Sequence, residues 1–321
     1  MSSALSRKKV GELVERCAVL ATLIEVSGYP KPGNVHRTRD AAKTRFEHFL
    51  AGSVAIGPTM RTLAEKGHDV GTGRLSVSRI GLGSQILRAT QDSLSWQRGG
   101  NVNLGVVLLL APLAAASGLH LPKMRHVDLP QLRQYIEVVI GGAVPNDSVG
   151  IYQAIRAAVP PRVLGKVDEL DVMDDAALDR IRKEGLTPLR IFEECRGRDS
   201  ICSEWVTGFS ATFTLGYPAL REALQQSGDI NMAVVHAFLS ILSEVPDSLI
   251  ERKSGRKAAL EVSRMASEVL KRGGLADSEG KKAVLEMDET LHRAGGDLNP
   301  GTTADLTAAS LYLLLFEGWR P

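Results

Sequence analysis

The sequence reads YPKPGNVHRTRD at residues 29–40, between two stretches whose apolar residues recur at helical spacing. Pro30 and Pro32 stiffen the backbone and remove two hydrogen-bond donors, so a helix that enters this stretch ends there. Gly33 lets the chain turn where a side chain would not fit. The turn also carries five charged or titratable side chains: Lys31, His36, Arg37, Arg39 and Asp40. It is therefore either a stiff basic loop between helices or one wall of an anion site.

Helical periodicity extends from this turn in both directions. Apolar residues between Val10 and Ile24 predict a first helix, and residues 46–56 predict a second, which Gly57-Pro58 breaks or kinks. Similar segments, about a dozen in all, continue to Phe316, whereas no segment alternates as a half-buried strand does. We therefore predict a single all-α domain over residues 1–321, a multi-helix bundle whose polar loops at the helix ends form the site.

The overall charge of the chain is small. Its 321 residues include 39 Lys and Arg against 37 Asp and Glu, a net charge of +2. Nucleic-acid binding through bulk charge is therefore not expected. The most apolar run, Val106–Ala116, is too short to span a bilayer and contains Pro112, and the polar N-terminus is unlike a signal peptide. We expect a cytoplasmic protein without a membrane partner, and a homo-oligomer is left open.

The three cysteines predict neither a disulfide framework nor a zinc site. Their number is odd and no Cys-x-x-Cys pair occurs. Cys17 falls on the apolar face of the first helix, and Cys195 and Cys202 lie seven residues apart, two turns along one helical face. This pattern favours a reducing compartment.

Four further polar islands resemble the opening turn. They lie near residues 99–105, 198–200, 247–255 and 299–305, and each leads from polar side chains into a helix. Such islands suit ordinary caps, and Thr302-x-x-Asp305 has the form of a capping box. They also suit anion binding, because helix N-termini present free N–H groups.

Taken together, the islands predict a site for a polyphosphate with a divalent ion. Lys and Arg neutralise phosphate, and carboxylates hold Mg²⁺, usually through waters. The chain lacks a Walker A sequence, a Gly-x-Ser-x-Gly and a His-Glu-x-x-His, so these residues indicate an all-α anion site without a named reaction.

Three of these segments resemble motifs of the triphosphoribosyl-dephospho-coenzyme A synthase family. Pro30–Arg37 resembles its Pro-Lys-Pro-Gly-Leu-Val-Asp-Arg signature, residues 247–255 its Asp-Thr-x-Ile-x-x-Arg-Gly-Gly element, and residues 299–306 its Pro-Gly-Gly-x-Ala-Asp-Leu-Leu-Ala ending. Arg198-Asp199-x-Ile201 also has a counterpart. Residues 100–105 lack the His and Lys of the family's Asn-Thr-His-Lys-Gly element, and His36 replaces an Asp. The chain therefore resembles a divergent branch, of the kind seen in archaea and some methylotrophic bacteria.

The resemblance implies an ATP-dependent glycosyl transfer. ATP loses adenine, and its triphosphoribosyl group moves to a ribose hydroxyl of 3′-dephospho-coenzyme A or a related acceptor, so the partners are small-molecule nucleotides. Two alternatives remain, a related ribosyl-phosphate transferase in a pterin-type pathway and a non-catalytic nucleotide-binding protein. An all-α, Mg²⁺-dependent nucleotide or ADP-ribose hydrolase is a third, weaker one.

We assign site roles on this basis. Catalysis is given to Asp247, Asp305 and His36, and Mg²⁺ binding to Asp247, Asp305 and Asp40. His36 is either an acid–base group or a second cation. Asn101 and Asn103 would position base or ribose. The other expected substrate-binding residues are Lys31, Gly33, Asn34, Arg39, Arg252, Lys253, Thr302 and Thr303.

Overall fold

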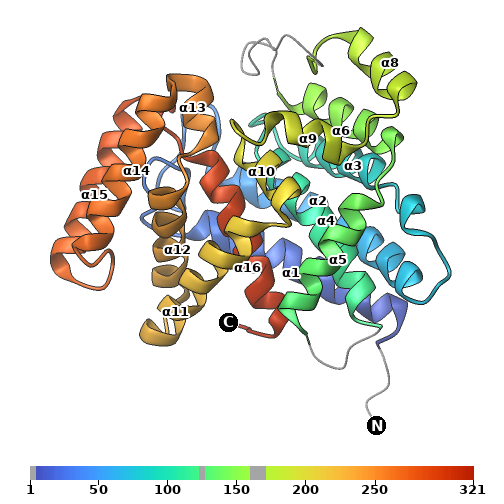
Figure 1. Ribbon diagram of the computed structural model, residues 1–321. Helices are drawn as coiled ribbons and strands as arrows, with labels where there is room; N and C mark the ends of the chain where they lie inside the picture. The colour runs from blue at the N-terminus through green and yellow to red at the C-terminus, as the bar shows by residue number, and fades with distance from the viewer. Residues whose placement is uncertain (1–4, 123–126, 160–170) are drawn as a thin grey trace.

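The computed structural model describes residues 5–122, 127–159 and 171–321. Within these residues the chain forms helices and no strand, which confirms the all-α prediction (Figure 1). The first half contains α1 (Arg7–Ser27), α2 (Phe46–Gly71), the 3₁₀ turn η1 (Val77–Arg79), α3 (Leu82–Ser95), α4 (Leu104–His120), α5 (Leu129–Gly141) and α6 (Pro145–Ala158). The second half contains α8 (Asp175–Glu184), α9 (Pro188–Cys195), α10 (Ser200–Thr207), the π-helical turn η2 (Thr212–Gly216), α11 (Tyr217–Ser227), α12 (Ile230–Glu244), α13 (Ser248–Ser254), α14 (Arg256–Lys271), α15 (Ser278–Arg293) and α16 (Gly301–Glu317).

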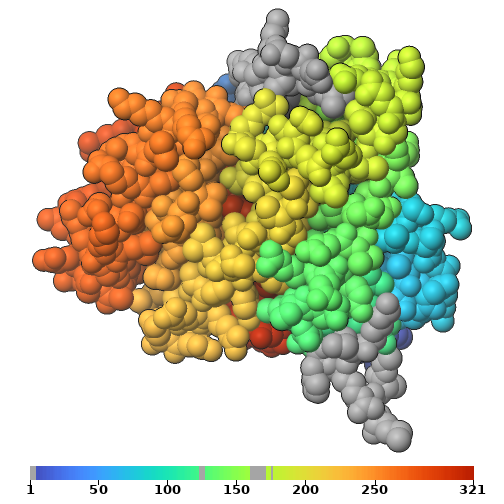
Figure 2. All heavy atoms as spheres, in the orientation of Figure 1, coloured from blue at the N-terminus to red at the C-terminus, as the bar shows by residue number. Residues whose placement is uncertain are grey.

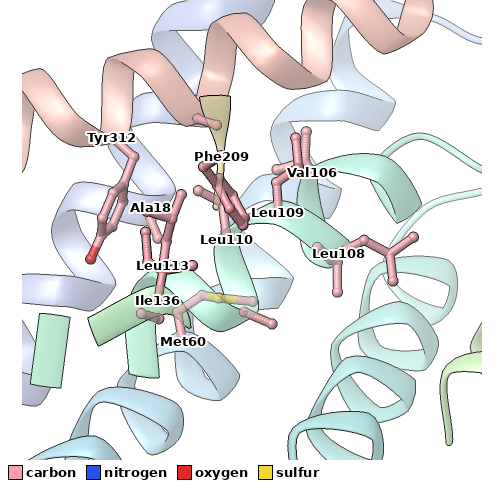
Figure 3. Packing of buried hydrophobic residues seen from close by; sticks show 14 of the residues in the cluster. Ala18, Met60, Val106, Leu108, Leu109, Leu110, Leu113, Ile136, Phe209 and Tyr312 are labelled. Carbon is pink, nitrogen blue, oxygen red and sulfur yellow. The ribbon is translucent and has the colours of Figure 1, made fainter. Parts of the chain in front are cut away.

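Helix α4 forms the centre of the larger hydrophobic core. Almost every residue from Leu104 to His120 is buried, as the apolar run predicted. Side chains from α1, α2, α5 and α16 surround it, among them Met60, Ile136 and Tyr312 (Figure 3). Helix α16 is buried on all sides over most of its length. A helix that is apolar all round is stable only inside a protein, so these two helices organise the bundle.

Small residues let α2 and α4 approach each other closely. A Cβ on Gly118 would lie 1.9 Å from the carbonyl oxygen of Ala64, and one on Gly67 would lie 2.0 Å from that of Ala115. Real carbon–oxygen contacts are never this short, so the crossing requires glycine at both positions.

A second, smaller core lies under the C-terminal helices. It is formed by residues of α12, α13, α14 and α15, with Ala304 of α16. One face of α12, with Val235, Phe238 and Leu239, belongs to this core, while Ala233 and Ala237 belong to the larger one. In Figure 2 these helices (orange) lie on the opposite side of the yellow α9–α11 segment from the green α5–α6 region.

Of the two effects predicted for Gly57-Pro58, a break or a kink, the break does not occur, because α2 continues through Pro58 to Gly71. Proline removes one backbone hydrogen bond and disfavours a helix interior. Burial of Ile56, Met60 and Leu63 on both sides of the proline offsets this cost.

No single helix of the described residues has both the length and the apolar character of a membrane span. Taken together, α12 and α13 meet both conditions by length and composition alone, with a bend of 56° between them.

Candidate active site

A cavity of about 570 Å³ lies where several helix N-termini converge. Its wall includes first-turn residues of α2, α4, α10 and α16, and in Figure 1 α16 begins between α13 and α10. The volume falls in the range of small-molecule sites. N-terminal turns carry partial positive charge, so their convergence favours an anionic ligand. A second hollow, about 1020 Å³, lies between α5 and α11 and contains none of the predicted site residues.

The structure brings some of the predicted site residues to this cavity and leaves others outside it. Those that line it are Asn34, Asn101, Asn103, Arg252, Thr302 and Asp305. Those that do not are Lys31, Gly33, His36, Arg39, Asp40, Asp247, Lys253 and Thr303. Thus each island contributes to the wall, but within the opening turn only Asn34 does.

Asp305 is a half-buried carboxylate near the N-terminus of α16 that lines the cavity without a hydrogen bond or ion pair to any described residue. Gly105 of α4 lies opposite, where a Cβ would come within 2.0 Å of Oδ2. Burial raises the pKa of Asp305 well above its ordinary value, and the charges of Glu25, Asp247 and Asp199 raise it further. The side chain is therefore an uncommitted acid at the cavity wall.

Asp247 is fully hydrogen-bonded inside the protein. Its Oδ1 accepts from the backbone N–H groups of Leu249 and Ile250 at 2.9 and 3.1 Å, which caps α13. Its Oδ2 accepts from N–H and Oγ1–H of Thr303 at 2.7 and 2.8 Å. These four donors occupy the carboxylate, which is 1% exposed. Asp247 thus joins α13 to α16.

The start of α16 differs from the predicted capping box. No side chain of its own caps the helix, and Thr302 instead accepts a hydrogen bond from Ser248 Oγ at 3.1 Å. The cap comes from Asp247, 56 residues earlier in the chain.

Lys31 lies inside the protein rather than on the cavity wall. Its side chain is 0% exposed and pairs with the Glu25 carboxylate, and its Nζ also donates to the Glu25 carbonyl at 3.0 Å. Burial lowers the pKa of Lys31, and Glu25 opposes this shift. The residue that reaches the cavity is Glu25, on the last turn of α1.

Sequence reasoning missed Glu25. A carboxylate between Thr22 and Val26, at an inward position near a helix end, was the available signal.

The rest of the opening turn is held by Asp288 of α15, a second residue that the sequence did not single out. Its carboxylate accepts from Gly33 N–H at 3.0 Å, lies 3.4 Å from His36 Nε2, and lies 2.9 Å from His292 Nδ1. Burial raises the pKa of Asp288, but these hydrogen bonds outweigh burial and hold it well below its ordinary value. His36 is buried here, so its predicted catalytic position at the site is not found.

The remaining predicted cations and carboxylates have local partners. Arg39 pairs with Glu289 at 2.7 Å, and Lys253 donates to the Gly296 carbonyl at 3.0 Å. Asp40 accepts from Phe46 N–H at 2.8 Å at the start of α2. No group of three His, Cys, Asp or Glu side chains suitable for a metal occurs in the described part of the chain, so Asp40, Asp247 and Asp305 do not form a common ligand set.

Two arginines face the cavity beside α10 and α13. Arg252 forms an ion pair with Asp199, whose Oδ1 caps α10 by accepting from Ile201 N–H at 2.9 Å. Arg198 is exposed at the cavity edge. These guanidinium groups suit phosphate, which they can bind through two parallel hydrogen bonds.

Asn101 and Asn103 form the mouth of α4. Asn101 Oδ1 accepts from Leu104 N–H at 3.0 Å, so it caps the helix. Asn103 Nδ2 is buried without a hydrogen-bond partner and lies close to Gly52 of α2. Asn34 Nδ2 donates to Asn299 Oδ1 at 2.9 Å, and both residues also line the cavity.

Cys195 and Cys202 form a disulfide in the cavity wall, contrary to the prediction. The helix breaks between them, because α9 ends at Cys195 and α10 starts at Ser200. The two Cα atoms are therefore only 5.8 Å apart, whereas two turns of one helix would separate them by about 10 Å.

Replacing both cysteines with serine is expected to lower the free energy of unfolding by about 2–3 kcal/mol, because the bridge restricts a short loop in the unfolded chain. Urea unfolding with and without dithiothreitol measures this loss. Reductant should shift the wild-type midpoint but leave that of Cys195→Ser/Cys202→Ser unchanged. An unshifted wild-type midpoint under full reduction would contradict the prediction.

The fold and cavity define a helical protein whose site suits a phosphorylated nucleotide. The family model described as ATP:dephospho-CoA triphosphoribosyl transferase matches residues 11–321, so the chain belongs to this transferase family. This confirms the family expected from the sequence motifs.

Individual relatives agree over nearly the whole chain. A protein of Streptococcus equi subsp. equi, described as a probable 2-(5″-triphosphoribosyl)-3′-dephosphocoenzyme-A synthase, is 28% identical over 97% of this chain and 98% of its own. The 2-(5″-triphosphoribosyl)-3′-dephosphocoenzyme-A synthase of Klebsiella pneumoniae is 23% identical over 97% of this chain and 92% of its own. A solved structure from Archaeoglobus fulgidus, provisionally described as a triphosphoribosyl-dephospho-CoA synthase, matches with a TM-score of 0.61 and 25% identity, over 84% of this chain and 100% of its own.

Proposed function

We propose that this protein transfers the triphosphoribosyl group of ATP to a ribose hydroxyl of 3′-dephospho-coenzyme A and releases adenine. The observation that carries the proposal is the cavity, where several helix N-termini and two arginines meet an uncommitted carboxylate, in a chain of this family. The helix N-termini, Arg198 and Arg252 would bind the triphosphate, since the first-turn N–H groups and guanidinium groups all donate to phosphate oxygens.

Asn34, Asn101 and Asn299 supply amide groups to the same wall, where they would hydrogen-bond the base and ribose. Arg252 keeps its assignment to phosphate because it lines the cavity. Lys31 and Arg39 do not line the cavity and pair with Glu25 and Glu289, so Arg198, which does line it, takes their place.

Magnesium fits this site only as the counter-ion of ATP. The four donors on Asp247 leave it no free oxygen for a metal, Asp40 lies outside the cavity, and the raised pKa of Asp305 disfavours its ionised form. Mg²⁺ prefers phosphate oxygens and waters to a dedicated protein cage. The described residues therefore do not form a magnesium site of their own.

Incubation with ATP and 3′-dephospho-coenzyme A tests the function. Free adenine and a product heavier than the acceptor by one triphosphoribosyl group should appear in equal amounts, by chromatography and mass spectrometry. Adenine release in water alone would indicate a hydrolase, and ATP binding without adenine release would indicate a non-catalytic protein. Either result contradicts the proposal.

Arg252→Ala is expected to raise the KM for ATP about 10-fold with a smaller change in kcat, because a partly exposed charged hydrogen bond to phosphate is lost. Lys253→Ala is the matched control, since Lys253 has the same charge but bonds the Gly296 carbonyl outside the cavity. Steady-state kinetics with varied ATP separates the two. Equal effects of both substitutions would remove Arg252 from the phosphate site.

A further inference from the structure

Glu25 has the position expected of a carboxylate that contacts a ligand. It lies in the last turn of α1, is buried, and lines the cavity. Its Oε1 accepts from Lys31 Nζ, and its Oε2 has no hydrogen-bond partner among the described residues. One oxygen is thus held in place and the other is available to a ligand.

Stability alone does not account for the Glu25–Lys31 pair. Burying two charges costs several kcal/mol per ion, and an apolar pair of similar volume is often as stable. Lys31 is fully enclosed, its Nζ 6.0 Å from the centre of the Phe238 ring, and its side chain donates only to Glu25. The ammonium therefore holds one carboxylate in place at the cavity wall and favours its ionised form.

Asp305 also lines the cavity, but its neighbours are mostly carboxylates, whereas the neighbour of Glu25 is a lysine. The groups that act on it are Glu25 of α1, Asp247 and Arg252 at α13, Asp199 before α10, and the buried Lys31. Burial raises the pKa of both Glu25 and Asp305. Lys31 counters the shift of the Glu25 pKa, whereas three neighbouring carboxylates add to the shift at Asp305, so Asp305 is the one of the two that is favoured to stay protonated. When the environment shifts the pKa values of two carboxyl groups apart in this way, one group is suited to act as a base and the other as an acid.

We infer that Glu25 accepts the proton of the attacking hydroxyl, that Asp305 donates a proton to the departing adenine, and that Lys31 is the positioning residue of Glu25. This inference rests on the proposed function. The bond between ribose C1′ and the adenine nitrogen breaks, with its electron pair and the Asp305 proton going to adenine. A bond forms between C1′ and the acceptor oxygen, whose proton goes to Glu25. Passage of that proton from Glu25 to Asp305 restores the site, so no other reactant is needed.

Kinetics at saturating ATP tests the two roles. Glu25→Gln and Asp305→Asn should each lower kcat about 100-fold or more, with little change in ATP affinity, as expected for loss of general acid–base groups. Glu15→Gln is the control, because Glu15 lies on the same helix but pairs with Arg61 away from the cavity. Retained kcat in Glu25→Gln overturns the inference even when the wild type transfers normally.

A changed leaving group separates the acid from the base. With a ribosyl triphosphate that carries nicotinamide in place of adenine, the base leaves as a neutral molecule without being protonated. Asp305→Asn should then approach wild-type rates, while Glu25→Gln should stay slow. Rescue of Glu25→Gln instead, or of neither variant, contradicts the assignment.

The pH dependence of kcat tests the protonation states assigned to Glu25 and Asp305, and the role of Lys31. The kcat of the wild type should fall at low pH as Glu25 is protonated and at high pH as Asp305 loses its proton. Lys31→Met should shift the low-pH limb upward, which a purely structural role would not do.

Carbon-13 NMR titration of the side-chain carboxyls gives a readout that needs no turnover. Asp305 should titrate at higher pH than Glu25, each assigned by its absence in Asp305→Asn or Glu25→Gln. If Glu25 titrates at higher pH than Asp305, the inference is overturned. If the wild type releases no adenine but the expected order is found, only the proposed function is contradicted.

Discussion

Asp247→Ala is expected to lower the free energy of unfolding by about 3–5 kcal/mol, because it leaves three backbone N–H groups and the Thr303 hydroxyl without their acceptor. The loss arises in the contact between α13 and α16, where the Asp247 carboxylate caps the N-termini of both helices. Urea unfolding followed by circular dichroism measures it.

Asp229→Ala is the matched control for this change. Asp229 caps α12 through the backbone N–H groups of Asn231 and Met232, but it is exposed and joins no second helix. Its removal should cost about 1 kcal/mol, as for an ordinary N-cap. Equal losses in the two variants would show that the bonds to Thr303 contribute little, and would contradict the role given to Asp247.

Gly118→Ala should destabilise the protein by about 3 kcal/mol or more, because the added methyl group would overlap the Ala64 carbonyl and force α2 and α4 apart. The separation would disturb the packing of α4, the central helix of the larger core. Thermal and urea unfolding both report the change.

Gly141→Ala provides the comparison. Gly141 ends α5, and nothing lies within 4 Å of the position that its Cβ would occupy. Alanine there should be neutral, or stabilising by up to about 1 kcal/mol through the unfolded chain. A similar stability of the two variants would show that the α2–α4 crossing adjusts freely.

Lys31 and His36 of the opening turn have their partners inside the protein and do not line the cavity themselves. Lys31 does not reach the cavity, but it orients Glu25 and favours its ionised form. His36 helps to anchor the turn to α15 through Asp288. The basic character of the turn therefore reflects two internal ion-pair networks, and among the described residues the cations that line the cavity are Arg198 and Arg252.

The sequence by itself determined the all-α class, the two buried helices and the islands around the cavity. These features are local, because helical periodicity, glycine, proline and caps act within a few residues. Asn101, Arg252, Thr302 and Asp305 were predicted for the site, and all four line its wall.

The directions in which the side chains of the turn and of the cysteines face depend on contacts between distant parts of the chain. Gly33 meets Asp288, 255 residues away, and Asp247 meets Thr303 across 56 residues. An irregular turn has no periodicity from which such directions follow, and a short break between α9 and α10 was enough to bring Cys195 to Cys202. Glu25 was not predicted for the same reason, since its pairing with Lys31 depends on the Lys31 side chain turning back toward α1 from between Pro30 and Pro32.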